Sequence, residues 1–171
     1  MIERVTHLSD CRRYRFTLWR EWDCDLLTGC ADDLPNVHKP LMVIGLNPST
    51  ADETKDDPTI RKCIGFAKRL GFGSLCMTNL FAFRATQPND MKAVGARAIG
   101  EENNAWLQQC AAEAGMILAA WGKDGSHLGR DKQVAAMFPN LVCLGNNNDG
   151  SPKHPLYVPY EAKPVPFKIA A

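Results

Sequence analysis

Short apolar runs alternate along the chain with segments of helical periodicity. Residues 14–19 alternate apolar and polar side chains, which is typical of a strand that is buried on one face and lies at a sheet edge. The other apolar runs are continuous, as in strands that are covered on both faces. These runs occupy residues 41–46, 75–78, 116–121 and 141–144. We therefore expect buried strands at these positions and an N-terminal edge strand or hairpin.

Three segments between the strands have the features of helices. Asp57 followed by Pro58 is a typical helix start, because Asp caps the free N–H groups and proline suits the first helical position. The apolar residues that follow recur on one helical face: Ile60, Cys63, Ile64, Ala67 and Leu70. Gly71 is expected to end this helix. We expect two more helices at about residues 101–114 and 130–138.

Strands that alternate with helices pair in parallel, because each connection has to cross over the sheet. We therefore predict an α/β fold, a three-layer α/β/α sandwich around a central, mostly parallel four-stranded sheet. The 171 residues suit one domain, so residues 1–171 are assigned to a single domain. Residues 23–40 are rich in Asp, Gly, Pro and Asn and are expected to be a long connection.

Composition and charge exclude several classes of protein. Apolar residues make up 45% and charged residues 23% of the chain, as in globular proteins with a core. No apolar run approaches the roughly 18 residues of a membrane span, and the N-terminus has no apolar signal core. The formal net charge of +1 argues against a strongly basic nucleic-acid surface, although a local basic face stays open. We expect a cytoplasmic protein without a membrane partner.

Seven cysteines are scattered along the chain without a Cys-x-x-Cys pair. Four have apolar neighbours and are expected to be small buried residues: Cys63, Cys76, Cys110 and Cys143. Cys11, Cys24 and Cys30 could form a metal site with a histidine, but they lack the clustered spacing of such sites. We therefore expect reduced thiols, no metal and no cofactor.

Polar residues collect where the predicted strands end. The glycine-rich phosphate motifs and the Gly-x-Ser-x-Gly nucleophile motif are absent. Ligands of α/β proteins bind beyond the carboxyl ends of the strands, which points to residues 47–57, 79–84 and 153–155. Each segment also has a plain structural interpretation: a turn opened by Asn-Pro, a strand-end cap and a solvated loop histidine.

These three segments resemble, in order, three motifs of the uracil-DNA glycosylase superfamily. The segments are residues 45–49 (Gly-Leu-Asn-Pro-Ser), residues 79–87 (Asn-Leu-Phe-Ala-Phe-Arg-Ala-Thr-Gln) and residues 154–155 (His-Pro). The resemblance implies a fold of the uracil-DNA glycosylase type. It also implies that Asn47 positions water, that Asn79 reads the edge of a base, and that His154 contacts the base oxygen.

Over nearly its whole length, from about Tyr14 to Tyr157, the chain is similar to an uncharacterised domain family found in bacteria and their viruses. The shared motifs are Asn-Pro-Ser-Thr-Ala-Asp, Asp-Asp-Pro-Thr-Ile-Arg, Asn-Leu-Phe-Ala and His-Pro-Leu-Tyr, at residues 47–52, 56–61, 79–82 and 154–157. This second resemblance implies a domain of unknown function and, by itself, no reaction.

The chemistry of N-glycosidic hydrolysis suits these residue types. The reaction needs water beside the sugar and stabilisation of the departing base. Asn47, made rigid by Pro48, could orient the water, but an amide is a weaker base than a carboxylate. Asp52, Asp56 and Asp57 lie in the adjoining loop. The catalytic candidates are Asn47, His154, Asp52 and Asp57.

The remaining candidates would bind the substrate: Asn79, Phe81, Arg84, Pro48, Ser49, Lys153 and Tyr157. The superfamily's aromatic residue after the first motif is missing from residues 49–62, and Tyr157, Phe81 or Phe83 could replace it. Contacts to phosphates could come from a set of basic residues: Arg12, Arg13, Arg15, Arg20 and Lys153.

We therefore expect a glycosylase-like hydrolase that cleaves the N-glycosidic bond of a base, modified or not. Its partner would be DNA, a nucleotide or a nucleoside, and the near-neutral charge favours a small substrate or single-stranded DNA over duplex. The alternative is a non-catalytic module of the same fold that binds a nucleotide or nucleic acid. Asn47, at a position where the superfamily often has Asp, keeps this alternative open.

Overall fold

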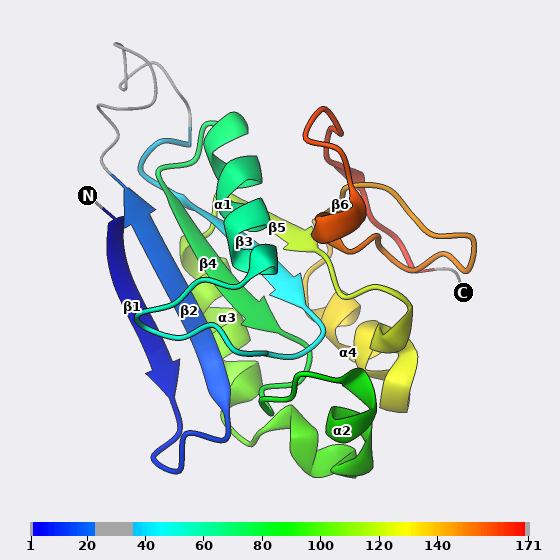
Figure 1. Ribbon diagram of the computed structural model, residues 1–171. Helices are drawn as coiled ribbons and strands as arrows, with labels where there is room; N and C mark the ends of the chain where they lie inside the picture. Colours follow the sequence, from blue (N-terminus) through cyan, green and yellow to red (C-terminus); the bar gives the residue numbers. More distant parts are fainter. Residues whose placement is uncertain (1, 23–35, 170–171) are drawn as a thin grey trace.

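One sheet of seven strands, in the order β1-β2-β4-β3-β5-β6-β7, forms the centre of this mixed α/β protein. The computed structural model describes residues 2–22 and 36–169 (Figure 1). The strands are β1 (Ile2–Leu8), β2 (Arg15–Trp22), β3 (Pro40–Gly45), β4 (Ser74–Asn79), β5 (Met116–Ala119), β6 (Val142–Cys143) and β7 (Val165–Pro166). The α-helices are α1 (Pro58–Arg69), α2 (Pro88–Ala93), α3 (Asn103–Glu113) and α4 (Arg130–Met137). Short 3₁₀ segments are η3 (Gly95–Ile99), η4 (Lys123–Gly129) and η5 (Pro155–Tyr157).

The four predicted buried runs form β3, β4, β5 and β6, which are neighbours in the sheet and pair in parallel. The hairpin β1-β2 joins them antiparallel through β4, and β7 pairs antiparallel with β6. The sheet is therefore larger than the predicted four-stranded core with its N-terminal addition. β7 escaped prediction because its two exposed residues carry no periodic pattern. Residues 15–19 of the alternating segment belong to β2. β2 lies between β1 and β4, so the edge position that we predicted for this segment is taken by β1.

Helix α1 begins and ends where the sequence predicts. Asp57 is its N-cap and accepts a hydrogen bond from the backbone N–H of Ile60 at 2.9 Å, while Pro58 takes the first helical position. Gly71 follows the C-cap with a φ of 79°, a conformation that glycine adopts at little cost. The capping residues therefore fix where the loop before α1 lies.

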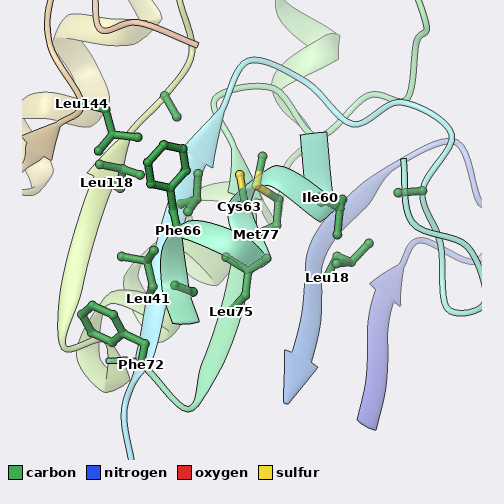
Figure 2. Packing of buried hydrophobic residues seen from close by; sticks show 14 of the residues in the cluster. Leu18, Leu41, Ile60, Cys63, Phe66, Phe72, Leu75, Met77, Leu118 and Leu144 are labelled. Carbon is green, nitrogen blue, oxygen red and sulfur yellow. The ribbon is translucent and has the colours of Figure 1, made fainter. Parts of the chain in front are cut away.

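The side chains of β3 alternate between two apolar clusters. Leu41 and Val43 pack in the cluster that contains the buried face of α1 (Figure 2). Met42 and Ile44 pack on the other face, in the cluster that contains residues of α3 and α4. In Figure 1, α1 lies in front of the sheet and α3 behind it. Burial on both faces explains why β3 reads as a continuous apolar run, and each large side chain stabilises the fold by about 2 kcal/mol.

Some predictions concern residues outside the described ranges. Most of the connection expected at 23–40 lies there, as do Cys24 and Cys30 of the candidate metal set. Within the described ranges, Cys63, Cys76, Cys110 and Cys143 are buried free thiols and Cys11 is an exposed one. The described residues contain no group of three or more His, Cys, Asp or Glu side chains that could hold a metal ion. No helix in the described ranges has the length and apolar character that crossing a membrane requires.

Candidate functional site

A cleft of about 860 Å³ opens at the edge of the sheet where β3, β4 and β5 end. Parallel strands present their carboxyl ends at one edge, so the segments that follow them meet there. Asn47 follows β3, Asn79 ends β4, and His154 follows the loop beyond β6; all three line the cleft. The structure thus brings together the three motif residues that the sequence analysis placed in one site.

Asn79 presents an unpaired amide to the cleft. Its side chain is 1% exposed, and neither Oδ1 nor Nδ2 has a hydrogen-bond partner in the described part of the chain. Gly45 is its partner in the β3–β4 pairing, and a Cβ there would lie 2.9 Å from Asn79 Oδ1, so the glycine leaves room for the amide. Buried polar groups are nearly always paired. This amide is therefore available to a ligand.

The backbone beneath Asn79 is held by two buried side chains behind the sheet. Asn103 Nδ2 donates to the carbonyl oxygens of Asn79 (3.1 Å) and Leu80 (3.0 Å). Arg130 Nε donates to the same Leu80 oxygen at 3.0 Å. These bonds fix the backbone at the end of β4, and with it the point from which the Asn79 side chain extends. Sequence reasoning missed both supporting residues, since nothing in a helical segment marks a polar residue that turns inward.

Asn47 is oriented by two carbonyl acceptors. Its Nδ2 donates to the backbone oxygens of Ala85 (2.8 Å) and Pro48 (3.0 Å). Only the amide nitrogen can donate to two carbonyls, so the Oδ1 atom is left as an acceptor. These bonds join the loop after β3 to the loop after β4 and hold Oδ1 in place.

His154 is a neutral hydrogen-bond donor in this arrangement. Its Nδ1 accepts a hydrogen bond from the backbone N–H of Leu156 at 3.3 Å, which assigns the ring proton to Nε2. Burial lowers the pKa of His154, and the charge of Asp57 opposes this shift. At neutral pH the imidazole is therefore uncharged and offers an Nε2–H group.

Of the two carboxylates predicted to be catalytic, one lines the cleft and the other does not. Asp57 lines the cleft, and one of its oxygens caps α1, which leaves the other oxygen outside the cap. Asp52 does not line the cleft. Its Oδ1 accepts hydrogen bonds from Thr54 N, Thr54 Oγ1 and Lys55 N at 2.9–3.0 Å. These bonds lower the pKa of Asp52, and those from Thr54 have the largest effect.

Asp124, which the sequence analysis did not single out, also lies on the lining of the cleft and pairs with Lys92 at 2.6 Å.

The predicted substrate-binding residues divide into two groups. Four line the cleft: Asn79, Ser49, Lys153 and Tyr157. Phe81 does not, since it is fully buried in the cluster behind the sheet. Pro48 is buried beneath the loop, and Arg84 turns away to donate to the carbonyl of Arg12. The short polar motif after β4 therefore contributes Asn79, while its next aromatic residue belongs to the core.

Among the basic residues proposed for phosphate contacts, Arg15 and Lys153 line the cleft. Arg12 pairs with Glu53 at 2.8 Å, and Arg20 pairs with Asp56 at 2.8 Å, so both are engaged elsewhere. Arg15 is buried although the alternating pattern of its strand suggested a solvent-facing position.

The segment after β5 is a part of the cleft that the sequence analysis missed. Its residues Trp121, Gly122, Lys123 and Asp124 all line the cleft. The rule that pointed to the other strand ends applies here as well, but the predicted strand extended to residue 121 and hid the loop. β5 ends at Ala119, two residues earlier.

Comparison with known proteins identifies the family but no characterised relative. None of the curated proteins and none of the solved structures matches the chain. The family model described as "Protein of unknown function (DUF1643)" matches residues 15–156, which include Arg15, Asn47, Asn79 and His154. The cleft is thus formed almost wholly by the matched region, and the chain belongs to the DUF1643 family.

Proposed function

We propose that this protein hydrolyses the N-glycosidic bond between a base and its sugar, in DNA or in a free nucleotide or nucleoside. The observation that carries the proposal is the amide of Asn79, which is buried, unpaired and on the lining of the cleft. A carboxamide offers a donor and an acceptor side by side. It matches the neighbouring N–H and C=O groups on the edge of a base that has left its stack.

The fold supports the same proposal. The four parallel strands have helices packed on both faces, and the three motifs similar to those of the uracil-DNA glycosylase superfamily fall at one edge of the sheet. We therefore extend the proposal to a three-layer arrangement of that superfamily's type.

In the proposed reaction, water adds to C1′ of the sugar while the bond from C1′ to the base nitrogen breaks. The sugar carries positive charge in the transition state. Asn47 Oδ1 accepts a hydrogen bond from the water, and the free oxygen of Asp57 accepts its proton. The base leaves with the bonding electron pair. The Nε2–H group of His154 and the amide of Asn79 stabilise the negative charge that the base acquires.

Two aromatic residues lie on the lining of the cleft. Tyr157 lies on the lining and is 83% exposed, so its ring is free to stack on a ligand. Trp121 is buried in the lining, packed edge-on against Phe167 at 5.5 Å between ring centroids. We propose that these residues take the role that an aromatic residue after the first motif has in the superfamily.

A second function, ligand binding without catalysis, is favoured by one specific observation. Both amide hydrogens of Asn47 are used in bonds to Ala85 and Pro48, and one oxygen of Asp57 caps α1. Catalysis then depends on a single carboxylate oxygen. A binding module would keep the base contacts of Asn79 without needing that oxygen.

The test is an assay for base release with the parent protein and Asn79→Leu. Substrates are single-stranded oligonucleotides that each carry one modified base, and free nucleosides and nucleotides. We expect the parent to release a base and Asn79→Leu to do so at least about 100-fold more slowly. Asn89→Leu, at an exposed position on α2, should match the parent. Saturable binding without release would favour the binding module, and equal behaviour of the parent and Asn79→Leu would contradict both functions.

A further inference from the structure

Three arginine side chains are fully buried in the described part of the chain: Arg15, Arg20 and Arg130. A buried guanidinium is costly unless several hydrogen bonds, with or without an opposite charge, compensate it. Arg20 is compensated by an ion pair with Asp56 at 2.8 Å and by the carbonyl of Trp19 at 2.7 Å. Arg130 donates to the Leu80 carbonyl at 3.0 Å and to Asn104 Oδ1 at 2.6 Å.

Arg15 lacks such compensation. Its guanidinium makes one hydrogen bond among the described residues, from Nη1 to the carbonyl of Ala51 at 2.8 Å. Its Nε is buried without a partner, and no carboxylate of the described residues lies within 4.0 Å of it. Burial lowers the pKa of Arg15 to about 10, with the charge of Asp57 opposing, so the group remains a cation at neutral pH.

Arg15 lies where its unpaired positive charge can contact a ligand in the cleft. The residue lines the cleft, and its backbone N–H donates to the carbonyl of Ala82 at 2.9 Å, beside the end of β4. The bond from Nη1 to Ala51 holds the guanidinium against the loop that follows Asn47. The charge is therefore fixed in advance at the wall of the cleft, and little ordering is needed when a ligand binds.

We propose that Arg15 binds a phosphate group of the ligand, so that the protein acts on nucleotides, free or within a DNA strand, rather than on nucleosides. This rests on the proposed function, in which Asn79 holds the base. A guanidinium presents a fork of N–H donors that fits the oxygens of a phosphate.

The charges around the cleft agree with an anionic ligand. Two further cations, Lys123 and Lys153, line it. Of the carboxylates on the described lining, Asp124 is paired with Lys92, which leaves Asp57 to oppose an anion. Asp57→Asn keeps a residue that caps helices well and removes this charge, so it should tighten phosphate binding.

The direct test is titration of the ¹⁵N-labelled protein with inorganic phosphate, followed through the Nε–H resonance of Arg15, which is assigned by its loss in Arg15→Lys. We expect a saturable shift of that resonance in the parent. Arg15→Gln should lose saturable shifts at the backbone N–H groups around Ala51 and Asn79. Arg97→Gln removes the same charge at an exposed position outside the cleft lining and should bind phosphate like the parent. No saturable shift in the parent, or unchanged binding by Arg15→Gln, would overturn the assignment.

A second measurement separates this inference from the proposed reaction. The affinities of the common nucleosides, their 5′-monophosphates and short single-stranded oligonucleotides are compared for the parent and Arg15→Gln by calorimetry. We expect phosphate to improve affinity about tenfold in the parent and to give no gain in the variant. Preference for the monophosphate indicates a free nucleotide, and preference for the oligonucleotide indicates a DNA strand. If phosphate improves affinity but no base is released, the phosphate-binding role of Arg15 is supported and the proposed hydrolase activity is contradicted. If a base is released but nucleoside and nucleotide bind with equal affinity, the hydrolase activity is supported and the role of Arg15 is contradicted.

Folding of the variants is controlled by thermal melts. Since Arg15 has no ion pair to lose, Arg15→Gln should melt close to the parent, and Arg15→Lys keeps the charge without the fork of donors. If Arg15→Gln does not fold, Arg15→Lys decides: weaker phosphate binding supports the assignment, and parent-like binding overturns it.

Discussion

The glycine opposite Asn79 shows how single residues set up the cleft. Gly45 ends β3, and because it has no side chain, the Asn79 amide fits beside it. The pattern Gly-Leu-Asn-Pro therefore combines two separate demands, room for Asn79 and a rigid turn at Asn47. The shared location of Asn47, Asn79 and His154 was predictable because each comes at or after the end of a predicted strand, and parallel strands end at one edge of the sheet. The buried position of Arg15 was less predictable, because an arginine in an alternating strand is expected to face water.

Gly45→Ala should weaken ligand binding more than it weakens the fold. The added Cβ would lie 2.9 Å from Asn79 Oδ1 and 2.7 Å from the flexible end of Met77, so both side chains must shift. Overpacking of this kind costs about 1–3 kcal/mol. Gly65→Ala is a matched control, since it meets the Tyr160 ring away from the cleft. Thermal melts should show a loss in both variants, and calorimetry with nucleotides should show weaker binding in Gly45→Ala alone.

His154 should make the protein less stable as the pH falls. Its pKa is lowered in the folded state by burial, so below about pH 6.5 the unfolded chain binds a proton more readily than the folded one. The contribution to stability is complete above the unfolded pKa and is lost as the pH falls toward the folded pKa. NMR titration of the ring should give a midpoint below 6.5. In His154→Gln, the decline of melting temperature between about pH 7 and pH 5 should be smaller; an identical decline would contradict this assignment.

At the scale of elements, the buried strands, helix α1 and the N-terminal hairpin were predictable, and β7 at the other edge of the sheet was not. β3 and β4 read as continuous apolar runs because both faces are covered, and α1 carries its start signal in Asp57-Pro58. The segment η4 gives no such signal, since it is broken by Leu128 and Gly129, which have positive φ angles of 57° and 64°. Local backbone irregularity of this kind depends on the neighbouring packing and not on a repeating pattern.

The capping of α1 by Asp57 and its proposed role in catalysis can be separated by a pair of substitutions. Asp57→Ala removes the cap of α1 and should cost about 1 kcal/mol of folding free energy, measured by denaturant unfolding. Asp57→Asn keeps a capping oxygen and should be nearly as stable as the parent. Both Asp57→Asn and Asp57→Ala should nevertheless lose base release. If Asp57→Asn kept full activity, Asp57 would only cap α1, and another group would have to take the proton from water.

At the scale of the whole molecule, strand order places the cleft. β3 lies between β4 and β5, and the connections to these two neighbours pass over opposite faces of the sheet through α1 and α3. The loops after β3 and β5 therefore diverge and leave an opening at the carboxyl edge. Alternation of strands and helices predicted a parallel sheet, and with it a site at this edge. The order of the strands depends on packing between distant segments that no local pattern encodes. The contribution of residues 121–124 to the cleft follows from this order and was therefore not predictable.

The central claim is that the cleft adds water to C1′ of a nucleotide and releases the base. The most direct measurement is incubation in H₂¹⁸O with pooled nucleotides and single-stranded oligonucleotides that carry modified bases, followed by mass spectrometry of both products. The account predicts a free base together with a sugar fragment that carries one ¹⁸O at C1′, and neither product with Asn79→Leu. Ligands that bind saturably but keep their base attached, with no ¹⁸O in the sugar, would contradict it.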